Sequence, residues 1–122
     1  MSELNGRVAL VTGSSSGIGE AIARRFADLG ATVVVNSSSS VEAGERVAAE
    51  LPGDASYARA DISDREQARA LIETAVERHG RLDILVNNAG WTQRVDHHDL
   101  DALTDDVFER TFDVNVFGTW WL

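Results

Sequence analysis

The stretch VALVTGSSSGIGEAIA, residues 8–23, joins an apolar run to a helix-like pattern through a turn of glycines and serines. Residues 7–12 form a short, nearly continuous apolar run, which is typical of a strand buried on both faces. The apolar residues after the turn recur at helical spacing, at Ile22, Phe26 and Leu29. Gly30 is well placed to end that helix. A linker would not be embedded in a buried strand–helix junction, so we interpret the turn as part of the fold.

The alternation of strand-like and helix-like segments continues along the chain. Three further strand-like runs lie at residues 32–35, 55–60 and 82–86. Strands that alternate with helices, without hairpin signals, are expected to pair in parallel with helices on both faces. The sequence therefore predicts an α/β fold, a doubly wound, Rossmann-like parallel sheet of four strands in three α/β/α layers. We expect a single domain over residues 1–122.

Capping signals predict where three of the helices begin. Ser39 with Glu42, and Ser63 with Glu66, have the spacing of a capping box, in which the two residues satisfy free backbone N–H groups at a helix start. Thr104 is expected to cap the last helix, because a threonine hydroxyl can accept a bond from the N–H groups of the first turn. Each of the three positions stands directly before a segment with helical periodicity.

Composition and charge exclude several function classes. Hydrophobic residues make up 43% of the 122 residues and charged residues 25%, as in an ordinary globular domain. With 20 acidic against 11 basic residues, the net charge is −9, which disfavours nucleic acid and anionic lipid as partners. The absence of cysteine excludes a disulfide scaffold and a cysteine zinc site, and His97 and His98 lack neighbouring ligands, so we expect no metal. With no signal pattern and no apolar run near about 18 residues, we expect a cytoplasmic protein.

The turn after the first strand has the properties of a phosphate-binding loop. Ligands of a doubly wound sheet bind at the carboxyl ends of its strands. The N–H groups at a helix start lack partners and favour an anion, and glycine leaves space for a pyrophosphate. A Walker loop is excluded, because Glu20 follows the last glycine. The candidate cofactor-binding residues of the turn are Gly13, Ser15, Ser16, Gly17, Ile18 and Gly19.

The pattern Thr-Gly-x-x-x-Gly-x-Gly at this turn resembles that of the short-chain dehydrogenase/reductase family, and three further features follow in matching order. The fourth strand is followed by an Asn-Asn-Ala-Gly motif, at Asn87, Asn88, Ala89 and Gly90. In the family this motif steadies the sheet and lines the cofactor. Asp61 and Ile62 match the family's pair that contacts adenine. Asn115 matches the asparagine on the next helix that supports a proton relay through water, and it is the candidate catalytic residue.

The resemblance implies an NAD(P)(H)-dependent oxidoreductase that transfers a hydride between nicotinamide and a small carbonyl or alcohol substrate. The family carries its chemistry on a serine and a Tyr-x-x-x-Lys in its later half. Here the only tyrosine is Tyr57, on the third strand, and the chain has no lysine. We therefore expect this chain to be the cofactor-binding half, cut within the helix that carries Asn115, and to be inactive alone. The alternative is a non-catalytic dinucleotide-binding module that acts as a sensor or assembly partner.

The residues after the second strand bear on the choice of cofactor. Selection of NAD(H) usually needs an acid there, which accepts hydrogen bonds from the ribose 2′-hydroxyl and repels a 2′-phosphate. Asn36, Ser37 and Ser38 offer donors without negative charge instead. No arginine stands in the turn or after the second strand, so the phosphate clamp is weak. We expect NADP(H) to be favoured over NAD(H), and Asn36→Asp to shift the preference toward NADH.

The last predicted helix bears on assembly. The resemblance implies that it packs against its mate in a second subunit, as in the family's dimers and tetramers. Its apolar positions exceed one core-facing stripe: Val107, Phe108, Thr111, Phe112, Phe117 and Trp121. We therefore expect a homo-oligomer, a dimer or a tetramer. Trp91 is expected to pack or to contact a subunit, although it stands where a wall on the substrate side would begin.

Overall fold

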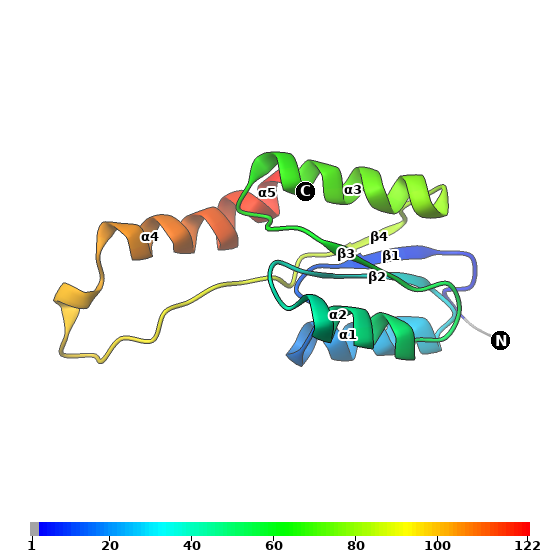
Figure 1. The fold of residues 1–122 in the computed structure, drawn as a ribbon, viewed down its shortest axis with the longest axis horizontal. Helices are drawn as coiled ribbons and strands as arrows, with labels where there is room; N and C mark the ends of the chain where they lie inside the picture. Colours follow the sequence, from blue (N-terminus) through cyan, green and yellow to red (C-terminus); the bar gives the residue numbers. More distant parts are fainter. Residues whose placement is uncertain (1–2) are drawn as a thin grey trace.

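The computed structural model describes residues 3–122, and its centre is a parallel sheet of four strands (Figure 1). The strands are β1 (Val8–Val11), β2 (Thr32–Ser37), β3 (Ser56–Arg59) and β4 (Ile84–Val86). Their order is β3-β2-β1-β4, and every neighbouring pair is parallel. The chain thus winds outward from β1 to β3 and then returns to the other side of β1. The carboxyl ends of β1 and β4 form the switch point at which such sheets bind ligands.

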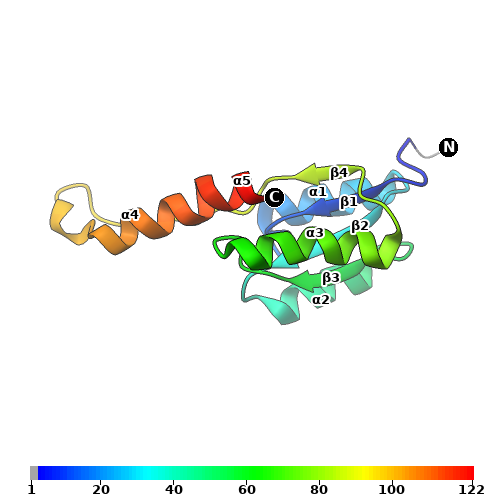
Figure 2. The ribbon, with the colours of Figure 1, turned by 90° about the horizontal axis from the view of Figure 1, so that it is seen from above.

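Helices cover both faces of the sheet, which confirms the predicted three layers (Figure 2). α1 (Gly17–Asp28) and α2 (Val41–Glu50) lie on one face, and α3 (Arg65–His79) on the other. Side chains of the central strands point alternately to the two faces, so each strand contributes to both cores. Val33 and Val35 pack toward α1 and α2, whereas Val34 packs toward α3. Burial on both faces explains why β1 and β2 are continuously apolar.

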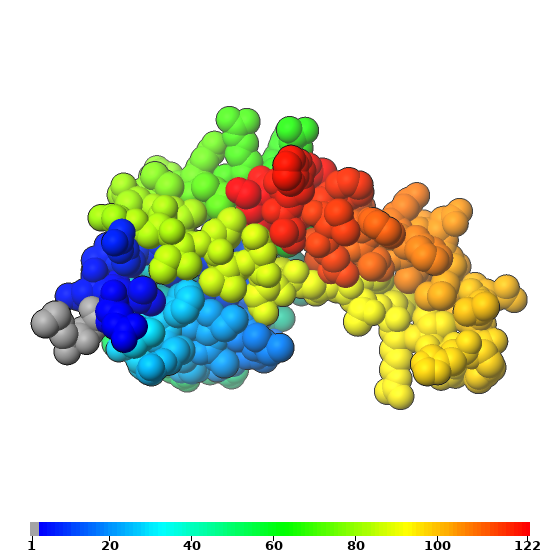
Figure 3. Space-filling view, turned by 180° about the vertical axis from the view of Figure 1, so that it is seen from behind, coloured from blue at the N-terminus to red at the C-terminus, as the bar shows by residue number. Residues whose placement is uncertain are grey.

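A long helical segment follows β4 and extends beyond the sheet. An irregular stretch leads to a short 3-10 turn, Leu100–Ala102, and then to α4 (Asp105–Phe112). A π-helical segment, Asp113–Gly118, joins α4 to α5 (Thr119–Trp121), so the predicted last helix is not a regular α-helix throughout. Figure 3 shows the orange part of this segment standing out from the body of the molecule, whereas its red end lies against the body. None of the helices within residues 3–122 is long and apolar enough to cross a membrane.

The helix starts differ from the expected capping boxes. Ser40, not Ser39, is the N-cap of α2, and Thr104 is the N-cap of α4 as predicted; neither side chain makes a capping bond in the described part of the chain. Asp64 caps α3, because its Oδ1 accepts bonds from the backbone N–H groups of Glu66 and Gln67, at 2.9 and 3.2 Å. Ser63 cannot take that role, since its hydroxyl donates to Asp61 Oδ1 at 2.6 Å.

One carboxylate ties the beginning of β4 to the beginning of β1. Asp83 Oδ2 accepts a bond from the Val8 N–H at 2.9 Å, and the Arg81 guanidinium donates to both oxygens of Asp83, at 2.8 and 2.7 Å. Arg7 adds a second charge at 3.6 Å. The bonds from Arg81, with the Val8 N–H and the charge of Arg7, lower the pKa of Asp83 to about 2. The ionised Asp83 carboxylate therefore stabilises the pairing of β1 with β4 at the amino ends of these strands.

Candidate cofactor site

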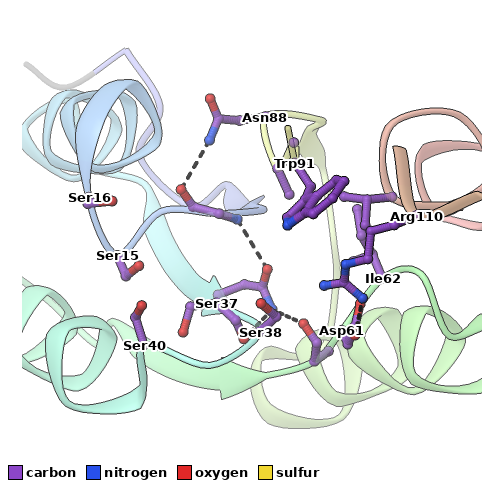
Figure 4. Close-up of a pocket in the computed structure, with 16 residues that line it drawn as sticks. Ser15, Ser16, Ser37, Ser38, Ser40, Asp61, Ile62, Asn88, Trp91 and Arg110 are labelled. Carbon is purple, nitrogen blue, oxygen red and sulfur yellow. Dashed lines mark hydrogen bonds and ion pairs between the residues drawn. The ribbon is translucent and has the colours of Figure 1, made fainter. Parts of the chain in front are cut away.

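A cavity of about 410 Å³ lies at the carboxyl ends of the strands, between the glycine turn, the ends of β2 and β3, and the segment after β4 (Figure 4). Most of the predicted cofactor residues line it. Those residues are Gly13, Ser15, Ser16, Asn36, Ser37, Ser38, Asp61, Ile62, Asn88, Ala89 and Gly90. The remaining lining residues are Ser40, Ala60, Trp91, Arg110 and Val114. The structure therefore brings together side chains from all four strand ends and from the last helical segment.

The glycines of the turn allow the backbone to pack closely against the segment after β4. Gly13 has a φ of +63°, and a Cβ there would stand only 2.9 Å from Ala89 Cα. A Cβ at Gly19 would collide with the side-chain amide of Asn88 and with the Gly13 carbonyl. Gly17 has a φ of +59°, a conformation that other residues rarely adopt. The turn is therefore shaped by glycine at each of these three positions.

Asn88 and Thr12 hold the end of β4 against the turn. The Asn88 amide donates from Nδ2 to the carbonyls of Thr12 and Gly13, at 2.9 and 3.1 Å. The Thr12 hydroxyl oxygen accepts bonds from the backbone N–H groups of Asn88 and Ala89, at 3.1 and 3.0 Å. Thr12 is fully buried. These bonds fix the turn next to the strand end across the switch point.

Asn36 is a structural residue of the cavity floor, not the free donor that was expected. Its side chain is 1% exposed, Oδ1 accepts from the Gly13 N–H at 3.2 Å, and Nδ2 donates to the Ala58 carbonyl at 3.0 Å. β2 runs through Ser37 rather than ending at residue 35, so Asn36 lies within the sheet and opposite Ala58. The oxygen and the nitrogen of the Asn36 amide are therefore both bonded to backbone groups, of Gly13 and Ala58 respectively. Asn36→Asp would therefore remove a buried hydrogen bond as well, and its shift of preference toward NADH stays a prediction.

Hydroxyl groups surround the part of the cavity near α1 and the end of β2. Ser15, Ser16, Ser37, Ser38 and Ser40 contribute them (Figure 4). Ser37 is paired with the Tyr57 hydroxyl at 2.5 Å, whereas the Ser16 side chain, at the N-cap of α1, makes no capping bond within residues 3–122. The first N–H groups of α1 therefore keep the capacity to bind an anion. Ser40 was missed from the sequence because it follows the strand by several residues.

Asp61 is an ionised acceptor at the opposite end of the cavity. Its Oδ1 accepts bonds from the Ser63 N–H and hydroxyl, at 3.0 and 2.6 Å. Partial burial raises the pKa of this carboxyl, but the two Ser63 bonds and the charges of Arg110 and Arg59 outweigh burial, so the pKa of Asp61 lies below its ordinary value. Ile62, beside it, is 4% exposed. The pair presents a carboxylate next to an apolar surface.

Asn115 and Arg110 come from the last helical segment and meet Trp91. Asn115 Oδ1 accepts a hydrogen bond from the backbone N–H of Trp91 at 2.7 Å, and Asn115 Nδ2 donates one to the backbone carbonyl of Trp91 at 2.9 Å. The Arg110 guanidinium lies over the Trp91 ring, 5.5 Å from its centroid, and 3.8 Å from Asp61 Oδ2. The sequence has no arginine in the turn or after the second strand, and no local pattern marks Arg110 as a residue of the site. Its place in the cavity depends on how α4 packs.

The model of the family described as short chain dehydrogenase matches residues 7–122. The chain belongs to the short-chain dehydrogenase family. It is 58% identical over 113 residues to the protein named "Granaticin polyketide synthase putative ketoacyl reductase 2" of Streptomyces violaceoruber, covering 93% of this chain and 45% of that protein. It is 43% identical over 120 residues to elsinochrome reductase 1 of Elsinoe fawcettii, covering 96% of this chain and 44% of that one.

Solved structures of short-chain dehydrogenases share the fold. A short chain dehydrogenase from Burkholderia cenocepacia in complex with NADP superposes with a TM-score of 0.91 at 40% identity, covering 97% of this chain and 48% of that one. A 3-ketoacyl-(acyl-carrier-protein) reductase from Brucella melitensis complexed with NADH gives a TM-score of 0.89 at 40% identity, covering 98% and 48%. The chain therefore spans about half the length of the relatives that it matches.

Four predicted cofactor residues of this short-chain dehydrogenase chain do not line the cavity. Gly17 and Gly19 act through the shape of the turn, Ile18 is 75% exposed, and Asn87 is exposed beside the partly buried Asn88. Asn115 also lies outside the lining, and its side-chain amide is used by Trp91, so a relay role stays a prediction. Within residues 3–122, no three histidine, cysteine, aspartate or glutamate side chains gather as a metal site would require.

Proposed function

We propose that residues 1–122 form one dinucleotide-binding domain of an NAD(P)(H)-dependent oxidoreductase, which reduces a carbonyl or oxidises an alcohol. The observation that carries this proposal is the glycine turn, packed on Asn88 at the switch point and opening directly into α1. The NADP and NADH complexes of structurally similar family members support it. The residues present fit such a cofactor, because the start of α1 offers unpartnered N–H groups and glycines leave its approach free of side chains.

Different parts of the cavity suit different parts of the dinucleotide. The start of α1, with Ser15 and Ser16, suits the pyrophosphate, and Asp61 with Ile62 suits the adenine, where a carboxylate can accept from an amine beside an apolar surface. When bound, the cofactor supplies the hydride. The protein supplies orientation. Asn115 holds the Trp91 backbone at the far side of the site, so it contributes by fixing this wall.

We also propose that the site prefers NADP(H) to NAD(H). Asp61 is the only carboxylate among the described residues that line the cavity, and it stands after β3 rather than after β2. The exposed Ser38 and Ser40 follow the end of β2 instead, so a 2′-phosphate would meet hydroxyl donors and no negative charge. The ion pair of Arg110 with Asp61 places the only cation of the described lining at the other end, which limits the preference to a modest one.

Titration of NADPH and NADH, followed by nucleotide fluorescence, tests this preference in the protein that carries this chain. We expect tighter binding of NADPH. Ser38→Asp places an acid at the exposed end of β2 and should reverse the order, because the carboxylate accepts from the 2′-hydroxyl and repels the phosphate. Ser39→Asp is the matched control, since Ser39 is exposed but does not line the cavity. Tighter binding of NADH to the wild type would contradict the preference.

A homo-oligomer, a dimer or a tetramer, is the proposed assembly. Large apolar side chains are exposed along the last helical segment, at Phe108, Phe112, Val116, Phe117 and Trp120. An apolar groove of about 250 Å³ runs beside α4, lined by residues that include Val107 and Thr111. Trp121, expected on the same surface, packs against the α3 core instead. Light scattering at micromolar concentration should show more than one subunit, and Phe112→Asp should reduce the mass. A cytoplasmic location stays a prediction.

A further inference from the structure

Arg110 connects two walls of the cavity that belong to different strands. Its guanidinium lies 3.8 Å from Asp61 Oδ2, after β3, and 5.5 Å from the centre of the Trp91 ring, after β4 (Figure 4). The side chain is 43% exposed, so it stands at the mouth of the cavity rather than in the core. An arginine needed only for helix solubility would have no reason to point across the cavity. Its position therefore suggests a role toward the ligand.

The Trp91 ring gives the guanidinium a fixed support. Asn115 holds both the N–H and the carbonyl of Trp91, at 2.7 and 2.9 Å, so the backbone that carries the ring cannot rotate freely. A guanidinium is planar and stacks on an aromatic face through cation–π attraction. Arg110 is thereby restrained in orientation at the same time as it faces Asp61. The three side chains act as one unit with Asn115 at its base.

The Asp61 carboxylate is held in orientation through Oδ1, and its Oδ2 can still accept a hydrogen bond. Ser63 occupies Oδ1 with two bonds, whereas the contact of Oδ2 with Arg110, at 3.8 Å, is longer than a hydrogen bond. Arg110 therefore attracts Oδ2 by charge and leaves its lone pairs free to accept. An ionised carboxylate accepts and does not donate. Such a group favours a ligand that presents an amine and disfavours one that presents a carbonyl oxygen.

We propose that Arg110 is a positioning residue for the cofactor, which holds Asp61 Oδ2 in the orientation that accepts a hydrogen bond from the amino group of the purine ring. The inference rests on the proposed dinucleotide function and adds a residue through which Asp61 acts. The chemistry of the ligand part is a 6-aminopurine. A 6-oxopurine would place its own acceptor against the carboxylate and bind less tightly.

The test compares NADPH with its 6-oxo analogue, reduced nicotinamide hypoxanthine dinucleotide phosphate, in the protein that carries this chain. The two nucleotides differ only at one edge of the purine, where the 6-amino group becomes a 6-oxo group and N1 gains a hydrogen, so the ratio of their dissociation constants reports on recognition of this edge. We expect Arg110→Met to lower the preference for the amino cofactor by about three- to fivefold, the effect of one partly exposed ion pair. Arg110→Gln should do the same and serves as the second variant if Arg110→Met does not fold. Arg69→Met, on the exposed face of α3, is the matched control and should leave the ratio unchanged.

A double variant distinguishes action through Asp61 from a general effect on the fold. In an Asp61→Asn background the purine preference should already be lost, and Arg110→Met should then change the ratio no further. An Arg110→Met variant that weakens both cofactors equally, or one whose effect persists beside Asp61→Asn, would overturn the inference while leaving the proposed function standing. A wild-type protein that binds neither nucleotide would instead overturn both.

Discussion

Asn36→Asp changes one atom of the buried amide that joins the glycine turn to the sheet. Nδ2 of Asn36 donates to the Ala58 carbonyl at 3.0 Å, and the side chain is 1% exposed. The substitution replaces this donor by an oxygen that faces a carbonyl oxygen, and it brings a charge into the interior. Loss of the bond and burial of an unpaired acceptor together cost about 2–4 kcal/mol of unfolding free energy.

Urea unfolding at pH 7, followed by circular dichroism, measures this cost. Burial raises the pKa of the new carboxyl above its value in the unfolded chain, so the folded state binds more protons and the variant loses stability as pH rises. The difference from wild type should therefore shrink toward pH 5, where a protonated carboxyl donates to the Ala58 carbonyl. Ser38→Asp, on an exposed residue, should change stability by less than about 0.5 kcal/mol. An Asn36→Asp protein as stable as wild type at pH 7 would refute the reasoning.

Gly19, Asp83 and Tyr57 each give a further prediction. Gly19→Ala should destabilise the protein by about 1–3 kcal/mol in urea unfolding and weaken NADPH binding, because the added methyl group meets the Asn88 amide and the Gly13 carbonyl; unchanged binding would contradict the packing of the turn. The pKa of Asp83 is lowered to about 2 in the folded protein, against about 3.9 in the unfolded chain. The ionised Asp83 therefore stabilises the fold fully above about pH 3.9, and this stabilisation is lost as the pH falls toward 2. Asp83→Asn should therefore flatten stability against pH between these values. Residues 1–122 alone should oxidise neither NADPH nor NADH with ketones or aldehydes, because Tyr57 is held by Ser37 at the sheet; turnover would refute this.

The fold could be predicted because its signals are local. Continuous apolar runs marked the central strands, and helical spacing with Gly30 and Gly80 marked the ends of α1 and α3, where both glycines have positive φ, +96° and +80°. The glycine turn and the Asn-Asn-Ala-Gly motif could be placed because each directly follows a strand, and parallel strands end at one edge of the sheet. The strand order then decides that these two motifs are neighbours.

The rest of the site depends on contacts between distant segments. The β-branched run stops at Val35 and so predicts Asn36 to be a free donor after the strand, whereas pairing with β3 extends β2 to Ser37. The spacing of Ser63 and Glu66 predicts a capping box, but in the folded turn the Ser63 hydroxyl donates to Asp61, a contact that the spacing does not reveal. Arg110 carried no local signal, since it enters the cavity only through the packing of α4.

The pairing of β1 with β4 has a kinetic consequence. β1 meets β2 across a single short helix, but the bond between Val8 and Asp83 spans 75 positions, so β4 must close a long loop before it can pair. Loop-closure entropy makes such distant pairings late events in folding. The Asn88 amide that completes the glycine turn arrives with β4. Among these four strands, competence to bind a dinucleotide is therefore acquired late, when β4 closes on β1.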